Sequence, residues 1–190
     1  MQGADKSLAS LRKIGGLMEE LIKKIRDVPD FPKKGVVFKD ITPLLADSYA
    51  FRKAIRLLAE YCRSKGKIDA VVCAESRGFI FGSALAYEIG AGFVPLRKPG
   101  KLPYKTLREE FQTEYSTDAF EVHEDAVKEG KNVIIVDDVL ATGGTARAAC
   151  NLVKKLGGNV LGLAFLIELE FLNGREKINE YDVLSLIKVK

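Results

Sequence analysis

The sequence predicts an α/β fold, with a mostly parallel twisted sheet that carries helices on both faces. Residues 68–74 and 133–136 are continuous apolar runs, which are typical of strands covered on both sides. Helical and strand-like segments alternate along the same part of the chain, at 78–89, 93–96, 145–156 and 160–167. This alternation indicates a parallel sheet, whose ligands bind at the carboxyl ends of the strands.

Two helices and a short strand are expected before this region. An apolar repeat every three or four positions predicts an amphipathic helix over 7–26, which Pro29 ends. An extended connection then leads to a short strand at 36–38. The next helix is expected to have its cap at Asp47 or Ser48.

The remaining segments are less regular. Residues 98–112 lack an apolar period and contain prolines and a glycine, so we expect a long loop there. Loops of this length inside compact domains usually have a function. Phe120 and Val122 indicate a short strand, and 181–189 is expected to close the chain as an edge strand.

Length and composition limit the classes of protein. The 190 residues are 47% hydrophobic, which is enough for one buried core, so we expect a single domain. The net charge is only +4 without a long run of like charge, which argues against nucleic-acid binding as the main role. We expect neither a signal peptide nor a membrane span. The three cysteines are widely spaced among apolar neighbours, which indicates reduced thiols in a cytoplasmic protein.

The segment 133–145 is the most informative part of the chain. A buried strand ends in Asp137 and Asp138, and a turn of small residues then leads into a helix, with Ala141, Thr142, Gly143, Gly144 and Thr145 in order. Unpaired amides and the helix dipole at such a turn favour a phosphate dianion, which the glycines allow to approach closely. The two acids can accept hydrogen bonds from sugar hydroxyls. The segment therefore predicts a site for a ribose 5-phosphate.

Two competing phosphate motifs are excluded for this segment. A Walker loop would need Gly-Lys-Ser/Thr, whereas this chain has Gly-Gly-Thr followed by Ala146, without a lysine. A dinucleotide fingerprint would need GxGxxG after a strand. A structural alternative remains open, in which the two acids only end a strand and the glycines only make a turn.

A second candidate anion site follows the apolar run at 68–74. Glu75, Ser76 and Arg77 lie between that strand and the next helix, where the guanidinium can bind phosphate oxygens in a bidentate way. Two such turns can hold opposite ends of one polyphosphorylated substrate. The alternative is a surface turn with a solvated arginine. Further positive charge borders the loop that follows, at Arg97, Lys98 and Lys101.

Residues 136–145, with the sequence VDDVLATGGT, resemble the phosphoribosyl pyrophosphate (PRPP) motif of the type I phosphoribosyltransferase family. Further segments are similar to the adenine phosphoribosyltransferases of that family and follow in the same order. These segments are 29–32, 35–43, 75–79, 97–103, 114–115 and 174–177. The resemblance covers nearly the whole chain from about Ile25 onward.

The resemblance implies a type I phosphoribosyltransferase fold in one domain, 1–190. It places a small N-terminal hood at about 1–45, a core at about 46–190 and a mobile catalytic loop at about 98–116. It implies transfer of the 5-phosphoribosyl group from PRPP to N9 of adenine, giving AMP and pyrophosphate in purine salvage. Magnesium is expected to be held mainly by the substrate, with no direct protein ligands, and the enzyme is expected to be a cytoplasmic homodimer without nucleic-acid or membrane partners.

The resemblance also implies a role for each site residue. It assigns the 5-phosphate to residues 141–145 and the ribose hydroxyls to Asp137 and Asp138. Pyrophosphate is assigned to Glu75, Ser76, Arg77, Arg97, Lys98 and Lys101, with a cis peptide between Glu75 and Ser76. Glu114 is the implied general base and Tyr115 an implied latch of the closed loop. Adenine is assigned to Val37, Phe38, Lys39 and Leu169.

Some features depart from the family or leave alternatives open. Lys39 stands where many relatives have arginine, and Pro99 stands where relatives often have a basic residue. The alternative for Tyr115 is an aromatic residue of the core. The alternative for Val37, Phe38 and Leu169 is that they are only core residues. His123 matches no functional residue and is expected on the surface. Two other functions remain: a 6-oxopurine or xanthine phosphoribosyltransferase, and a non-enzymatic regulator that senses PRPP.

Overall fold

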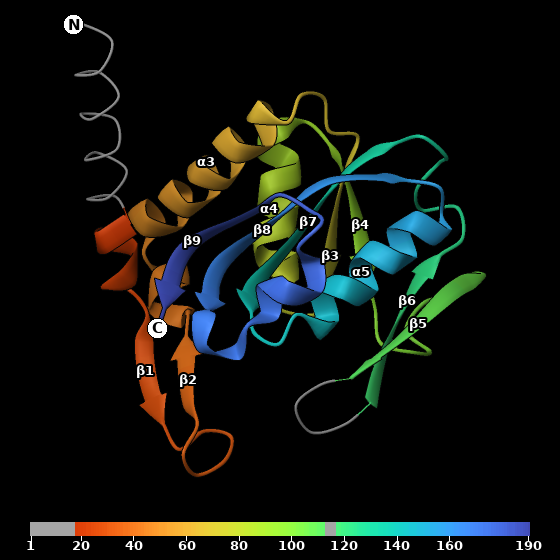
Figure 1. Cartoon of the computed structure of the whole chain (residues 1–190). Coiled ribbons are helices and arrows are strands. Elements are labelled where there is room, and N and C mark those ends of the chain that lie inside the picture. The colour runs from red at the N-terminus through yellow and green to blue at the C-terminus, as the bar shows by residue number, and fades with distance from the viewer. Residues whose placement is uncertain (1–17, 113–116) are drawn as a thin grey trace, which may run out of the picture. The chain divides into compact units, whose positions relative to one another are not determined.

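The computed structural model describes residues 18–112 and 117–190. The chain divides into two compact units, Met1–Ala54 and Ile55–Lys190, which are described separately (Figure 1).

A two-stranded hairpin is the main feature of the first unit. Residues 18–22 are helical, and the antiparallel pair β1 (Arg26–Pro29) and β2 (Val37–Asp40) follows. The predicted helix over 7–26 is therefore wrong at its end, because Arg26 pairs with Asp40 in the hairpin. Its residues 7–17 lie outside the described residues. The unit also contains α2 (Thr42–Ala46) and the start of α3 (Ser48–Ser64).

A parallel five-stranded sheet forms the centre of the second unit, as predicted. Its strands lie in the order β4-β3-β7-β8-β9, and every neighbouring pair is parallel. Their bounds are β3 (Ala70–Ala74), β4 (Gly92–Leu96), β7 (Asn132–Leu140), β8 (Asn159–Leu169) and β9 (Val183–Val189). The last strand lies at one edge, as expected. The strand β7 continues through both aspartates, beyond the predicted end at 136.

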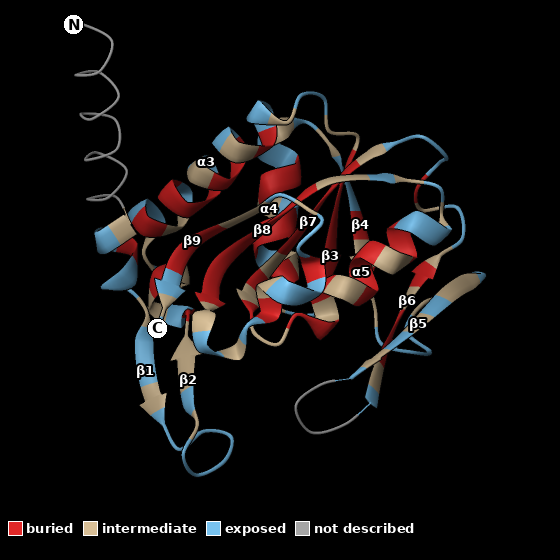
Figure 2. Cartoon of the chain, viewed as in Figure 1, coloured by how far each residue is buried: buried red, intermediate tan, exposed pale blue. Residues whose placement is uncertain are grey.

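Helices cover both faces of this sheet, as the apolar runs predicted. On one face, α5 (Gly144–Lys155) packs with Val72 and Ile135 in a core that Figure 2 shows as buried. On the other face, α4 (Gly78–Ile89) packs so closely that a Cβ atom on Gly82 would lie 1.8 Å from Cys73 Sγ. Because neighbouring strand residues point to opposite faces, Val72 and Cys73 mark the two sides.

The predicted loop at 98–112 is wrong in its second half. Residues Thr106–Gln112 form β5, which pairs antiparallel with β6 (Thr117–His123). Only Leu107 and Phe111 of this strand pack against the core, so too few apolar residues were present to show the alternation. The short helices η1 (Glu170–Leu172) and η2 (Gly174–Ile178) were not predicted either.

The three cysteines, Cys62, Cys73 and Cys150, are buried and free, in agreement with the expectation of core thiols. Burial raises the pKa of Cys62 and of Cys150 to about 11, so both thiols stay protonated at neutral pH.

Candidate functional site

The two turns that the sequence singled out meet at the carboxyl edge of the sheet, at the border between the neighbouring strands β3 and β7. The strand that follows β3 along the chain, β4, lies on one side of β3, and the later strands β7, β8 and β9 lie on its other side. The strand order therefore changes direction between β3 and β7. Ligands of open α/β sheets bind at such a border. The turn 75–77 follows β3, and the turn 141–143 follows β7. Arg77 Nε lies 2.8 Å from Asp138 Oδ2, so an ion pair joins the two segments.

The turn after β7 encloses a small cavity of about 50 Å³. The lining residues are Asp137, Val139, Leu140, Ala141, Thr142, Gly143, Thr145, Ala146 and Phe165. Helix α5 begins at Gly144, directly after Gly143 of the turn. The first N–H groups of a helix have no partner within it and carry the positive end of its dipole. The cavity therefore combines a concave shape with amide donors and hydroxyl groups, which suits a phosphate.

The two glycines of this turn have close protein neighbours. Gly143 has a φ of +76°, and a Cβ atom there would lie 2.2 Å from the Gly174 carbonyl oxygen. A Cβ atom on Gly144 would lie 2.5 Å from the carbonyl oxygen of Gln112. From the sequence, we interpreted these glycines as allowing a phosphate to approach the backbone closely. The structure adds that other segments of the chain also come too close for a side chain.

Burial and mutual repulsion act on the two aspartates. Asp138 is buried, and Asp137 Oδ1 accepts a hydrogen bond from the Asp138 amide at 2.9 Å. Burial raises the pKa of Asp137 well above its usual range, and the neighbouring Asp138 charge raises it further. Burial also raises the pKa of Asp138, although the Arg77 guanidinium opposes this shift. Hydroxyl groups of a sugar could donate to these oxygens and replace water around them.

The turn after β3 holds its charged side chains in ion pairs. The peptide between Glu75 and Ser76 is cis, as the resemblance implied. Arg97 Nε donates to a carboxylate oxygen of Glu75. Burial is the largest single effect on Glu75 and favours its neutral form, but the hydrogen bonds from Arg97 and the Lys98 backbone and the nearby positive charges together outweigh it, so the pKa of Glu75 is lowered. Glu75 is therefore charged at neutral pH and forms an ion pair with Arg97.

The two lysines of the predicted pyrophosphate group differ in their surroundings. Lys98 Nζ lies 3.0 Å from Asp118 Oδ2 of β6, and Lys101 is exposed. Both follow Arg97, whose backbone forms two hydrogen bonds with Glu121. The start of the loop is thus attached to the hairpin β5–β6.

The residues that the resemblance assigned to adenine lie in both units. Val37, Phe38 and Lys39 belong to β2 of the first unit, where the Phe38 ring packs edge-on against Phe31 at 5.2 Å. Lys39 Nζ lies 2.7 Å from Asp27 Oδ1, so its ammonium group is held within the hairpin. Leu169 is the last residue of β8 in the second unit.

Glu114 and Tyr115 lie outside the described residues. His123 was expected on the surface, but it is half-buried, and its ring packs edge-on against Tyr104 at 6.0 Å. The two rings meet because Tyr104 lies just before β5, whose first residue Thr106 pairs with His123.

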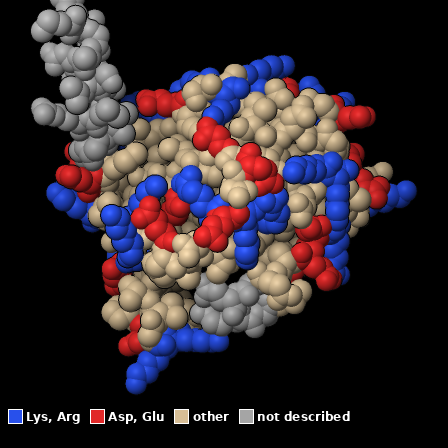
Figure 3. Space-filling view, viewed as in Figure 1, with Lys and Arg blue, Asp and Glu red and all other residues tan. Residues whose placement is uncertain are grey.

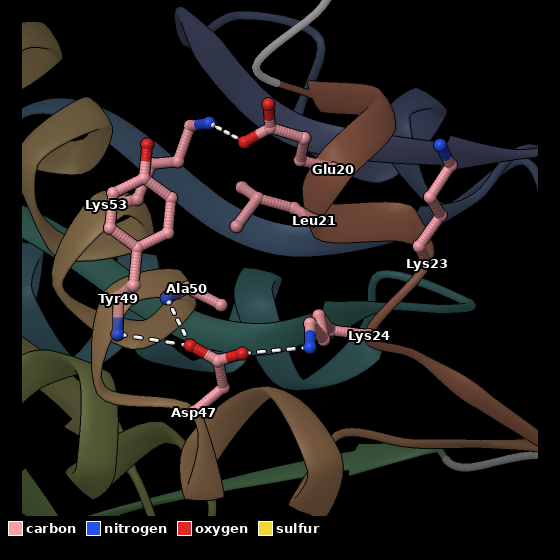
Figure 4. A pocket seen from close by; sticks show the side chains of 8 residues that line it. All are labelled: Glu20, Leu21, Lys23, Lys24, Asp47, Tyr49, Ala50 and Lys53. Carbon is pink, nitrogen blue, oxygen red and sulfur yellow. Dashed lines mark hydrogen bonds and ion pairs between the residues drawn. The ribbon is translucent and has the colours of Figure 1, made fainter.

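A larger cavity, of about 180 Å³, lies in the first unit (Figure 4). Asp47 at its edge accepts hydrogen bonds from the Tyr49 and Ala50 amides, both at 3.0 Å, and caps α3 as predicted. Lys24 Nζ lies 2.8 Å from Asp47, and Lys53 forms an ion pair with Glu20. Since these charged groups neutralise one another around apolar atoms, we assign the cavity a structural role.

Sequence reasoning missed the segment that supports the turn after β7. Gly174 of η2 contacts the turn, and Arg175 and Arg147 hold η2 through hydrogen bonds to Glu168 and to the Lys177 carbonyl. The only signal was the resemblance of 174–177 to the family, to which no role was attached.

Comparisons with known proteins identify the family of this chain. Residues 42–190 match the family model of the phosphoribosyl transferase domain. The chain is 57% identical to an adenine phosphoribosyltransferase of Thermotoga neapolitana over 168 residues, which are 88% of this chain and 98% of the relative. For one of Thermoanaerobacter sp., the identity is 56% over 171 residues, 90% of this chain and 98% of the relative.

Solved structures give the same result. The crystal structure of adenine phosphoribosyltransferase from Thermoanaerobacter pseudethanolicus has a TM-score of 0.88 at 55% identity, covering 90% of this chain and 99% of that one. The Saccharomyces cerevisiae structure, complexed with an imino-altritol bisphosphate and adenine, has a TM-score of 0.85 at 43% identity with the same coverage. This chain belongs to the adenine phosphoribosyltransferase family of the type I phosphoribosyltransferases.

Proposed function

We propose that this protein transfers the 5-phosphoribosyl group from PRPP to N9 of adenine and releases pyrophosphate, which makes AMP by purine salvage. The observation that carries the proposal is the meeting of two anion-binding turns at the β3–β7 border, joined by Arg77 and Asp138. PRPP carries a phosphate at one end and a pyrophosphate at the other. A family member of Saccharomyces cerevisiae was solved with adenine and a bisphosphate.

The turns divide the substrate between them in this proposal. The amides and hydroxyls of residues 141–145 bind the 5-phosphate at the start of α5. Asp137 and Asp138 accept hydrogen bonds from the ribose hydroxyls. The backbone of Glu75 and Ser76 receives the pyrophosphate, and Arg77 adds a guanidinium once its contact with Asp138 is shared with the ligand. The positively charged side chains Arg97, Lys98 and Lys101 lie at the start of the loop.

Catalysis would come mainly from position and charge. As the bond between C1 and pyrophosphate loosens, positive charge develops on the ribose and negative charge on the leaving group. The carboxylates at 137 and 138 hold the sugar, while the cationic side chains stabilise the pyrophosphate. Glu114 would remove the imidazole proton of adenine as general base, and Tyr115 would hold the loop closed.

Adenine would be read by main-chain groups of the first unit. By resemblance, the backbone of Val37 and Lys39 would read the base edge, and the Phe38 ring would stack on the base. A carbonyl oxygen that accepts from the 6-amino group would face the 6-oxo group of hypoxanthine or guanine as a second acceptor. Leaving such buried polar groups unpaired discriminates strongly.

Magnesium would be held mainly by PRPP in this proposal. Among residues 18–112 and 117–190, no three acidic, histidine or cysteine side chains converge in a way that could hold a metal ion. The oxygens of a bound pyrophosphate would instead supply most of the ligands, since magnesium prefers substrate phosphates and water. The ion would neutralise charge on the leaving group.

We propose a homodimer on the basis of an apolar face in the second unit. Tyr87 on α4 is 91% exposed, and Ile80 and the edge-strand residue Phe93 are 38% and 37% exposed. An all-round apolar helix such as α4 is normally buried. We also propose a cytoplasmic location, which the free buried cysteines support because thiols persist in a reducing compartment. In the described part of the chain, no helix is long and apolar enough to cross a membrane.

A small-molecule role also suits the surface charge. On the face in Figure 3, Lys and Arg side chains alternate with Asp and Glu, rather than forming the basic stripe of a nucleic-acid interface.

A steady-state panel of adenine, hypoxanthine, guanine and xanthine, each with PRPP and magnesium, tests the proposal. We expect turnover with adenine and at least roughly 100-fold lower kcat/KM with the other bases. Preference for a 6-oxopurine would establish the rival transferase. Binding of PRPP without turnover of any base would instead establish the sensing regulator.

A further inference from the structure

We propose that Arg175 is a positioning residue, which shapes the phosphate-binding turn from behind through Gly174. This inference rests on the proposed function, since it takes residues 141–145 as the site of the 5-phosphate. Arg175 lies in η2, and none of the predicted substrate contacts involves this residue.

The backbones of Gly174 and Gly143 lie in direct contact. A Cβ atom on Gly174 would lie 2.0 Å from the Ala141 carbonyl oxygen and 2.8 Å from the Gly143 amide nitrogen. A Cβ atom on Gly143 would in turn lie 2.2 Å from the Gly174 carbonyl oxygen. The peptide planes of the turn therefore lie directly against Gly174. Any displacement of Gly174 changes where the amides of the turn point.

Gly174 is attached to the sheet through its neighbour Arg175. Arg175 Nε lies 2.9 Å from Glu168 Oε1, and Nη2 lies 2.5 Å from Glu168 Oε2. The same guanidinium donates to the Val183 carbonyl at 3.0 Å and to Ser185 Oγ at 3.3 Å. Four hydrogen bonds thus connect one side chain to both β8 and β9. A bidentate pair of this kind fixes orientation as well as distance.

Charge and burial make this attachment strong. Glu168 is only 5% exposed, and the hydrogen bond from Arg175 lowers its pKa against the effect of burial. An ionised carboxylate in such a place requires its partner. The far end of η2 is held separately, because Arg147 of α5 donates to the Lys177 carbonyl at 2.6 Å.

The functional consequence concerns the phosphate alone. A turn whose amides point away from the phosphate loses affinity for phosphorylated ligands, because preorganised donors must match the position of the charge. Binding of the nucleoside part depends on groups outside the turn, among them the two aspartates. Loss of Arg175 should therefore weaken AMP binding much more than adenosine binding.

The experiment measures the dissociation constants of AMP and adenosine by calorimetry in the full chain. The test variant is Glu168→Gln with Arg175→Met, which removes both charges and leaves no buried carboxylate unpaired. We expect the ratio of adenosine to AMP dissociation constants to fall roughly 10- to 100-fold, the loss of one hydrogen bond to a charged group. The KM for PRPP should rise while the KM for adenine stays within about twofold.

Arg175→Lys is the conservative variant, which retains a charge for Glu168 but not the bidentate geometry, and it should recover part of the ratio. Asn132→Ala is the matched control, because it removes a 3.2 Å hydrogen bond to the Lys67 carbonyl at the start of β7, at the opposite end of that strand from the turn. It should lower stability without changing the ratio.

The outcomes separate this inference from the function on which it rests. A double variant that is folded by circular dichroism, with the ratio of the unmodified protein, would overturn the role of Arg175. If the unmodified protein bound adenosine as tightly as AMP, the phosphate site itself would be refuted.

Discussion

Replacement of Gly143 by alanine tests whether the turn after β7 needs glycine for its backbone angle, for close packing or for both. A left-handed φ of +76° costs alanine about 1–2 kcal/mol. The Cβ atom of alanine would lie 2.2 Å from the Gly174 carbonyl oxygen, which adds an overpacking cost of about 1–3 kcal/mol, since this neighbour is backbone and cannot rotate away. The total is about 2–5 kcal/mol of unfolding free energy.

Gly90 provides a matched control in the same unit. It ends α4 with a φ of +69°, and a Cβ atom there would meet no heavy atom within 4 Å. Gly90→Ala should therefore cost only the backbone part, about 1–2 kcal/mol. The two variants should differ by about 1–3 kcal/mol, or roughly 2–12 °C in the melting temperature of a chain of this size.

Urea unfolding and thermal unfolding of both variants measure the difference, and the KM for PRPP measures the effect on the site. Gly143→Ala should raise that KM, whereas Gly90→Ala should leave it unchanged. Equal losses of stability in the two variants would show that the contact with Gly174 carries no cost, and the reasoning from packing would be refuted.

Three further predictions concern charged groups. Asp137→Asn should stabilise the ligand-free protein by about 0.5–2 kcal/mol and weaken PRPP binding. Because the pKa of Asp137 is raised in the folded protein, the gain in melting temperature should grow from pH 4 to pH 8. A gain that does not depend on pH would contradict this reasoning. Arg147 lowers the pKa of Glu180 to about 2, so the stability from this pair is present above about pH 4.3 and is lost as the pH falls towards 2; Glu180→Gln should flatten acid unfolding in that window. Glu114→Gln should lower kcat by roughly 10²–10⁴-fold with PRPP affinity nearly intact, and equal losses in both would indicate a folding defect.

The sequence by itself determined the parallel core and the position of the two turns. Continuous apolar runs can be satisfied only where both faces of a strand are covered, so 68–74 and 133–136 indicated central strands without knowledge of their partners. The change from such a run to acids and glycines at 137–145 likewise depends on neighbouring residues alone. Local chemistry of this kind can be read along the chain.

Contacts between distant segments could be decided only by the tertiary structure. The strand β5 shows little apolar alternation, because it packs through two side chains and is otherwise held by pairing with β6. Arg26 was expected in a helix but pairs with Asp40 in a hairpin, since pairing across the chain outweighs local helical preference. The approach of Gly174 to Gly143 joins residues 31 positions apart through backbone atoms, and side-chain periodicity carries no record of such a contact.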